Sequence, residues 1–289
     1  MSVTPAAIYI VATPIGNLAD ISQRALDTLT QVDIIFAEDT RNTRKLLSHY
    51  GIHNTLHSLH EHNEVEKTQY IIQLLEQNQS IALVSDAGTP LISDPGYRMV
   101  NILSQAGFSI IPIPGACAII TALSIAGLST ERFTFEGFLP SKPSARRTYL
   151  EENQQEVRTQ VYYESSHRIQ ASIADFQQVF GQQREIVLAR ELTKLYEDIF
   201  RGTIAELSVW IDADPMHKKG EFVLILQGFT KTENSDEYTL SSEKVLSSLL
   251  EQLPVKQASS IAAKMLNISK NNLYKQALQL KNKGDKPEN

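Results

Sequence analysis

The chain has 289 residues, of which 42% are apolar and 21% charged, and its formal net charge is −6. This length favours about two domains, and the apolar content indicates a soluble globular protein with sizeable cores. No apolar run is long enough to cross a membrane. The single cysteine, Cys117, excludes internal disulfides and Cys-based zinc sites, so we expect a cytoplasmic protein that holds no metal.

The first 115 residues alternate apolar strand-like runs with helical patterns. The expected strands lie at residues 8–14, 32–39, 81–86 and 109–114, and the expected helices at 21–29, 43–50, 63–77 and 97–105. The first run has no basic segment before it, which indicates a strand and no signal peptide. Such alternation predicts a parallel sheet covered on both faces, and residues 1–115 therefore form the first of two expected α/β domains.

Residues 116–230 are expected to form the second α/β domain. A helix of small residues starts at a Pro-Gly turn and ends before Gly127. Strands are expected at residues 133–140, 161–165, 184–191 and 220–229, with a further strand-like segment near residue 200. The spacing of these segments indicates hairpin-like and mixed pairing.

The end of the chain has a different composition. Residues 231–240 are polar and without periodicity, which predicts a linker, and residues 241–289 predict a small helical domain. Residues 252–284 contain six Lys and no acid, although the whole chain is acidic. A basic tail indicates contact with a polyanion, and a solvated helical face is the alternative.

The segment at residues 81–96, IALVSDAGTPLISDPG, is the most informative of the chain. A buried strand leads into a loop in which Gly88 and Gly96 give a ligand access to the backbone. Asp86 and Asp94 make this loop a poor phosphate site. We expect it to bind a ligand with hydroxyl groups or a positive charge, and an ordinary pair of turns is the alternative.

Other polar clusters also follow predicted strands, and loops at the same edge of two sheets face each other across a cleft. In EDTR, Arg41 is a candidate for holding an anion and Asp39 for accepting a proton, or Asp39 caps a helix beside an exposed arginine. ARELTK offers Glu191 and Lys194, with a solvated charged turn as the alternative.

A third cluster, GFLPSKPSARR at residues 137–147, predicts a mobile basic loop. Its cations are Lys142, Arg146 and Arg147. Such a loop beside a cleft holds a nucleic-acid backbone, and a plain surface loop is the alternative. The sequence contains no GxGxxG after a strand, no GxxxxGK[ST] and no GxSxG, which argues against the usual nucleotide-binding and acyl-transfer sites.

Eight segments stand in order between residues 13 and 226: TPIGNLADIS, AEDTRNT, SDAGTPLISDPG, PGACAIITALSIAGL, GFLPSK, YESSHR, RELTK and GEFVLIL. Together they closely resemble the tetrapyrrole methylase family. The resemblance implies two α/β domains that bind S-adenosylmethionine in the cleft between them, usually in a homodimer. The ligand of the loop at residues 81–96 would then be S-adenosylmethionine, because Asp86 offsets the positive charge of the cofactor's sulfonium.

By this resemblance the cofactor pocket takes residues from both domains. They are Pro14, Asp86, Ala87, Gly88, Ile92, Ser93, Cys117, Ala118, Tyr163, Leu192, Gly220 and Glu221. The chain departs from the family where Ala116-Cys117 replaces the common Pro-Ser and where Ser166 replaces the common Pro. The first departure puts a side-chain hydroxyl contact at position 117 in doubt.

Some members of the family methylate tetrapyrrole carbons and others methylate RNA. The basic tail, which resembles a helix-turn-helix unit, favours RNA, and the resemblance implies 2′-O-methylation of a cytidine in 16S ribosomal RNA at the decoding centre of the 30S subunit. The expected RNA contacts are Lys142, Arg146, Arg147, Lys264, Lys270 and Lys275. Asp39 or Glu191 would accept the proton, with Arg41 and Lys194 as further catalytic candidates.

Two other functions stay open. A tetrapyrrole C-methyltransferase would share the cofactor pocket but needs no basic tail. A ligand-sensing regulator would read DNA with that tail, although a tail with Lys and no Arg is poorly suited to base readout.

Overall fold

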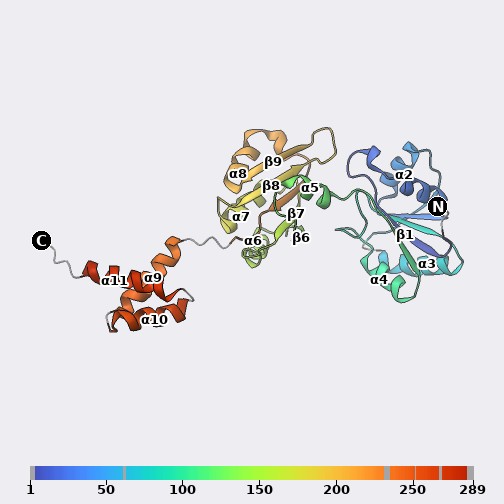
Figure 1. Cartoon of the computed structure of the whole chain (residues 1–289). Coiled ribbons are helices and arrows are strands. Elements are labelled where there is room, and N and C mark those ends of the chain that lie inside the picture. Colours follow the sequence, from blue (N-terminus) through green and yellow to red (C-terminus); the bar gives the residue numbers. More distant parts are fainter. Residues whose placement is uncertain (1–3, 61–62, 231–234, 251, 267–268, 285–289) are drawn as a thin grey trace. The chain divides into compact units, whose positions relative to one another are not determined.

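The computed structural model describes residues 4–60, 63–230, 235–250, 252–266 and 269–284. The chain divides into two compact units, Met1–Phe229 and Thr230–Asn289 (Figure 1). The first unit contains two five-stranded sheets and the second consists of helices. None of the described helices is long and apolar enough to span a membrane.

The first sheet is entirely parallel and has the order β3-β2-β4-β1-β5. Its strands are β1 (Ala7–Val11), β2 (Ile34–Ala37), β3 (Thr55–Ser58), β4 (Ile81–Val84) and β5 (Ser109–Ile113). Four of them follow the predicted alternation. The sequence analysis missed β3, because this short edge strand has no buried side chain to give an apolar pattern.

Helices cover both faces of this sheet, as the alternation predicts. Between the strands lie η1 (Leu18–Asp20), α1 (Gln23–Gln31), α2 (Thr40–His49), α3 (Glu64–Glu76) and α4 (Tyr97–Gln105). Alternate strand residues point to opposite faces, so Tyr9 packs with Leu29 of α1 whereas Ile8 packs in the cluster with Ile71 of α3. All these strands therefore end at one edge of a rigid sheet.

The second sheet is mixed and has the order β6-β7-β10-β8-β9, in which only β6 and β7 are parallel. Its strands are β6 (Phe133–Phe138), β7 (Thr159–Ser165), β8 (Glu185–Arg190), β9 (Asp198–Thr203) and β10 (Glu221–Leu226). The predicted mixed pairing is confirmed. One face packs on α5 (Ala118–Ala126), and the other on α6 (Pro143–Glu152), α7 (Ile169–Phe180) and α8 (Ile204–Ala213), which η2 (Pro215–Lys218) follows.

Helix α6 corrects one prediction of the sequence analysis. Residues 143–147, expected in a mobile loop, form the first turns of this helix, because Pro143 stands at a helical position where its missing N–H costs nothing. Arg146 faces the interior and is 2% exposed, and its Nε lies 2.6 Å from Oδ2 of Asp175. Arg146 therefore belongs to a structural ion pair and is not presented to RNA.

The second unit packs three helices around a small core. They are α9 (Ser235–Leu250), α10 (Val255–Leu266) and α11 (Lys270–Gly284). α9 begins inside the expected linker, and its first turn, Ser235-Asp236-Glu237, carries the acidic residues that favour the start of a helix. The remaining residues of that linker, 231–234, lie outside the described residues.

The apolar residues of this unit divide between its core and its surface. The core includes Leu246, Ala262, Leu273 and Ala277. Ile261, Met265, Tyr274 and Leu278 are exposed, and Ile268 lies outside the described residues. Lys264, Lys270 and Lys275 are exposed, as expected.

Candidate functional site

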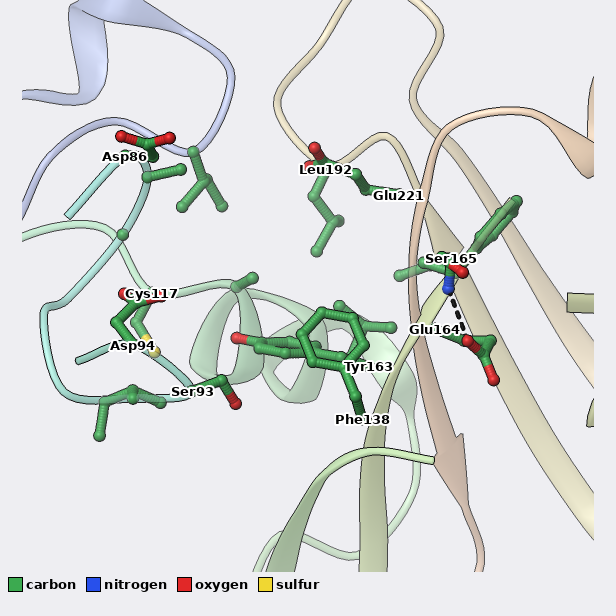
Figure 2. Close-up of a pocket in the computed structure, with 18 of the residues that line it drawn as sticks. Asp86, Ser93, Asp94, Cys117, Phe138, Tyr163, Glu164, Ser165, Leu192 and Glu221 are labelled. Carbon is green, nitrogen blue, oxygen red and sulfur yellow. Dashed lines mark hydrogen bonds between the residues drawn. The ribbon is translucent and has the colours of Figure 1, made fainter. Parts of the chain in front are cut away.

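A pocket of about 600 Å³ lies where the loops of the first sheet meet the second sheet (Figure 2). Loops after β1, β2 and β4 form one side, and the start of α5, the end of β7 and the start of β10 form the other. Its volume is in the usual range for small-molecule sites, and strand ends of α/β sheets are where such sites occur.

The loop after β4 is fixed to the loop after β1 by a two-way backbone contact. The N–H of Thr13 donates to the carbonyl of Gly88 at 2.9 Å, and the N–H of Gly88 donates back at 3.0 Å. Gly88 has φ +82°, in the region that favours glycine. The backbone of this loop thus reaches the pocket wall without an intervening side chain.

Two loops at the pocket contain non-glycine residues whose backbone lies in the left-handed region, with positive φ. Leu91 and Ser93 have φ values of +73° and +67°, and Glu191 and Thr193 have values of +50° and +64°. This backbone conformation costs free energy and persists only where the surrounding structure holds it, and such residues gather at functional sites. Their position in the loops after β4 and β8 supports the assignment of this pocket as the site.

The charged side chains of the pocket wall are all acidic. Among the described residues that line it are Glu38, Asp86, Asp94, Glu164 and Glu221, and no Lys, Arg or His lines it there. The pocket therefore suits a cationic or hydroxyl-bearing ligand and is unfavourable for a phosphate. This agrees with what Asp86 and Asp94 led us to expect from the sequence.

Asp86 ties the pocket to the start of α2. Its two carboxylate oxygens accept hydrogen bonds from the backbone N–H of Asp39, at 3.1 Å, and from the side-chain amide of Asn42, at 2.9 Å. The carboxylate is thus held in a fixed orientation at the pocket wall (Figure 2). Fixed carboxylates attract a cation more strongly than mobile ones, because no side-chain freedom is lost on binding.

Asp39 and Arg41 bind each other next to the pocket. Asp39 caps α2 by accepting from the backbone N–H of Arg41, and the Arg41 guanidinium lies 2.6 Å from its carboxylate. Hydrogen bonds from Arg41 lower the pKa of Asp39 to about 2. Both residues lie outside the pocket wall, and the Arg41 side chain is 84% exposed.

Glu191 and Lys194 form a second ion pair outside the wall. Nζ of Lys194 lies 2.9 Å from a carboxylate oxygen of Glu191 and 2.9 Å from one of Glu221. Burial raises the pKa of Glu191, but hydrogen bonds from Lys194 and from the backbone of Glu221 outweigh it, and the net pKa is lowered. This pair fixes the loop that places Leu192 in the pocket.

Asp94 is one of the acids of the pocket that the expected cofactor residues did not include. It is half-buried, and burial raises its pKa to about 6, with the negative charges of Glu38 and Asp86 adding to the effect and a hydrogen bond from Ser85 opposing it. The sequence signal was present, because Asp94 stands in the same Gly/Pro-rich loop as Asp86.

The structure brings the expected cofactor residues together. Asp86, Ala87, Gly88, Ile92, Ser93, Cys117, Ala118, Tyr163, Leu192, Gly220 and Glu221 all line the pocket. Pro14 does not, and its neighbour Ile15 lines the pocket instead. Cys117 stands directly before α5 as its N-cap and makes no capping bond with its side chain.

Residues at the end of β7 form a buried polar network that the sequence analysis missed. Glu164 accepts from the hydroxyl of Ser172 at 2.6 Å. It also accepts from the backbone N–H of Ser165 at 2.7 Å, and Figure 2 shows this second bond. Arg168 pairs with the same carboxylate at 2.8 Å. Glu164 thus holds Ser165 and Ser166 in the pocket wall.

Gly220 is expected to tolerate no side chain. It has φ +108°, and a Cβ there would lie 2.5 Å from Cγ of Glu191, whose carboxylate is held by Lys194 and by the N–H of Glu221. We expect Gly220→Ala to lower the free energy of unfolding by about 2–4 kcal/mol, measured by urea denaturation.

Gly51→Ala is the matched control for this substitution. Gly51 also has a positive φ, +66°, but nothing lies within 4 Å of a Cβ built there. Its replacement by alanine should lower the free energy of unfolding by about 1 kcal/mol, because only backbone strain is added. Equal losses in both variants would show that the contact with Glu191 is unimportant.

Two family models match the sequence in separate parts of the chain. The model of the Tetrapyrrole (Corrin/Porphyrin) Methylases matches residues 7–208. The model of the RsmI C-terminal HTH domain matches residues 239–281, within the helical second unit.

Three similar proteins from different bacteria carry the same name. The chain is 52% identical over 267 residues to ribosomal RNA small subunit methyltransferase I of Haemophilus influenzae, which covers 92% of this chain and 94% of that protein. It is 49% identical to the protein of the same name from Escherichia coli O157:H7, with 94% of each chain covered. The identity to that of Pseudomonas aeruginosa is 46%, with 96% and 98% covered.

Solved structures with a similar fold are more distant in sequence. Diphthine synthase superimposes with a TM-score of 0.59 at 15% identity, covering 76% of this chain and 90% of that one. A cobalt precorrin-4 methyltransferase of cobalamin biosynthesis gives a TM-score of 0.55 at 15% identity, covering 77% and 95%. At these identities the likeness establishes the fold alone.

Proposed function

Since the chain belongs to the tetrapyrrole (corrin/porphyrin) methylase family, we propose that it methylates the ribose 2′-hydroxyl of a cytidine in 16S ribosomal RNA, at the decoding centre of the 30S subunit. In coarser terms it is a methyltransferase of small-subunit ribosomal RNA that uses S-adenosylmethionine. The observation that carries the assignment is the 52% identity across both units to a protein of that name.

The pocket residues fit S-adenosylmethionine. When bound, this cofactor supplies a methyl group on a positively charged sulfur. Among the described residues the wall has fixed carboxylates and no Lys, Arg or His. This charge suits the sulfonium of the cofactor and the ammonium of its methionine part. We assign Asp86 and Asp94 to these charges, and the apolar side chains of Ile92 and Leu192 to the adenosine.

Methyl transfer to a hydroxyl also requires a proton acceptor. Asp39 and Glu191 are the proposed acceptors, and each is paired with a cation that makes it a weak base. Arg41 and Lys194 are also suited to an RNA phosphate. A phosphate that draws the cation away would raise the pKa of its carboxylate, so we propose that RNA binding itself prepares the base.

The basic surface of the second unit supports an RNA substrate. Lys264, Lys270 and Lys275 are exposed on α10 and α11. Lys142 and Arg147 are the remaining proposed contacts of the first unit, and Arg147 is half-exposed and pairs with Asp175 at 3.3 Å. We further propose a homodimer that acts in the cytoplasm.

Tritiated methyl transfer tests the proposed function. The substrate is 30S subunits from a strain that lacks this gene, and the labelled RNA is digested to nucleosides. We expect the label in 2′-O-methylcytidine. Label in a base, or transfer to a tetrapyrrole but not to 30S subunits, would contradict the proposal.

Removing the second unit separates RNA binding from cofactor binding. A chain that ends at Phe229 keeps the whole pocket, because every residue that lines it lies in the first unit. We expect at least a tenfold loss of methyl transfer to 30S subunits, since several phosphate contacts are removed, with unchanged affinity for S-adenosylmethionine in calorimetry. Full methylation by this shortened chain would exclude a role of the second unit in RNA binding.

A further inference from the structure

Phe138 is unusual among the residues that line the pocket. Most of the apolar residues in the wall are buried or half-buried, but Phe138 is 55% exposed and Ile92 is 40% exposed. Phe138 stands at the end of β6, in the second half of the first unit. A large aromatic ring thus lies at the pocket and remains accessible to a ligand.

The ring is held in place although it is exposed. Its centroid lies 5.4 Å from that of Tyr163, with the two planes tilted by 57°, and Figure 2 shows both rings in the middle of the pocket. Tyr163 in turn meets Phe135 edge to face at 4.9 Å. Phe138 thus packs on a tyrosine that is itself held by a second ring, so it loses little further freedom when a ligand stacks on it.

A β-bulge aims Phe138 at this position. In a regular strand, side chains three residues apart point to opposite faces, so Phe135 and Phe138 would not contact the same ring. The pairing of β6 with β7 shifts register between Phe135 and Gly137, and Gly137 has φ +67°. The shift brings Phe138 onto the side of Tyr163, and such bulges often re-aim a side chain near an active site.

We propose that Phe138 is the platform on which the base of the methylated nucleotide stacks. This inference rests on the proposed function, because it requires an RNA substrate. Proteins that recognise one nucleotide of an RNA commonly bind its base unstacked, and exposed aromatic rings then replace the lost stacking partners. The wall beside the ring carries carboxylates and no cation in the described residues, so it would not hold the neighbouring phosphates.

The test compares substitutions that keep the aromatic face with substitutions that remove it. Phe138→Tyr and Phe138→Trp keep it, whereas Phe138→Leu removes it but keeps an apolar side chain. With saturating S-adenosylmethionine, we expect Phe138→Leu to raise the KM for 30S subunits on the order of tenfold, the size of one base–aromatic stack. The Tyr and Trp variants should stay within about threefold of the unaltered protein.

Phe133→Leu is the matched control. Phe133 stands at the other end of β6 and is 39% exposed, but it does not line the pocket. Its replacement should leave the KM for 30S subunits unchanged. Thermal unfolding of each variant checks that the fold is retained.

The affinity for S-adenosylmethionine decides between two uses of the ring. Calorimetry should give the same Kd for the unaltered protein and for Phe138→Leu. A Kd that rises in parallel with the KM would mean that Phe138 contacts the adenine of the cofactor, and it would overturn the inference. An unchanged KM in Phe138→Leu would also overturn it while leaving the proposed function intact, whereas no transfer by the unaltered protein would reject both.

Discussion

Replacing Arg146 by methionine is expected to lower the free energy of unfolding by about 3 kcal/mol, because it leaves the buried carboxylate of Asp175 without its main partner. The side chains of the pair are 3% and 8% exposed, and their atoms lie 2.6 Å apart. Arg147 still reaches Asp175 at 3.3 Å, so we expect the lower end of the range for broken buried pairs. Urea denaturation measures the loss.

Arg147→Met is the control for this prediction. Arg147 neighbours Arg146 and pairs with the same carboxylate, but its side chain is 39% exposed. Replacing Arg147 should lower the free energy of unfolding by less than about 1 kcal/mol, as for other exposed ion pairs. If Arg146→Met kept full stability and lost RNA affinity instead, the role that the sequence first indicated for Arg146 would be correct.

The affinity for S-adenosylmethionine is expected to rise about tenfold between pH 5 and pH 7. The pKa of Asp94 is about 6 in the free protein, so most of this carboxyl is neutral at pH 5 and ionised at pH 7. Only the ionised form attracts the cationic cofactor. Calorimetry across this pH range tests the prediction, and Asp94→Asn should bind with an affinity that does not change with pH.

The same carboxyl makes the free protein sensitive to pH. A raised pKa means that folding disfavours the ionised form, so the penalty is fully present above about pH 6 and disappears as the pH falls below the ordinary value of 3.8. Asp94→Asn should therefore raise the free energy of unfolding at pH 8, by about 1–2 kcal/mol after allowance for solvent screening. An equal gain at pH 4 would contradict this origin.

The sequence predicted the parts of the structure that depend on apolar periodicity. Buried strands such as β1 and β4 leave a clear pattern, and their loops fall at one sheet edge in any parallel sheet. The edge strand β3 has no such pattern and was missed. The cofactor residues came from the resemblance to a family, because no local rule assigns Cys117 or Gly220 to one pocket.

Charged side chains were the least predictable part of the site. Arg146 and Arg147 are neighbours with the same chemistry, yet one is buried against Asp175 and the other half-exposed, and only the packing of α6 on α7 decides this. Asp39 and Asp94 both follow strands, but Arg41 lowers the pKa of one and burial raises that of the other. Their pKa values depend on partners that the sequence does not reveal.

The strand order of the first sheet has a consequence for synthesis of the protein. β1 pairs with β4 and β5, so during synthesis it has no partner until β4, at residues 81–84, has followed it. An apolar strand that waits this long is open to aggregation and to chaperones. β8 and β9, in contrast, are consecutive antiparallel strands that pair as soon as both have emerged. We therefore expect the nascent first sheet to depend more on chaperones than the second.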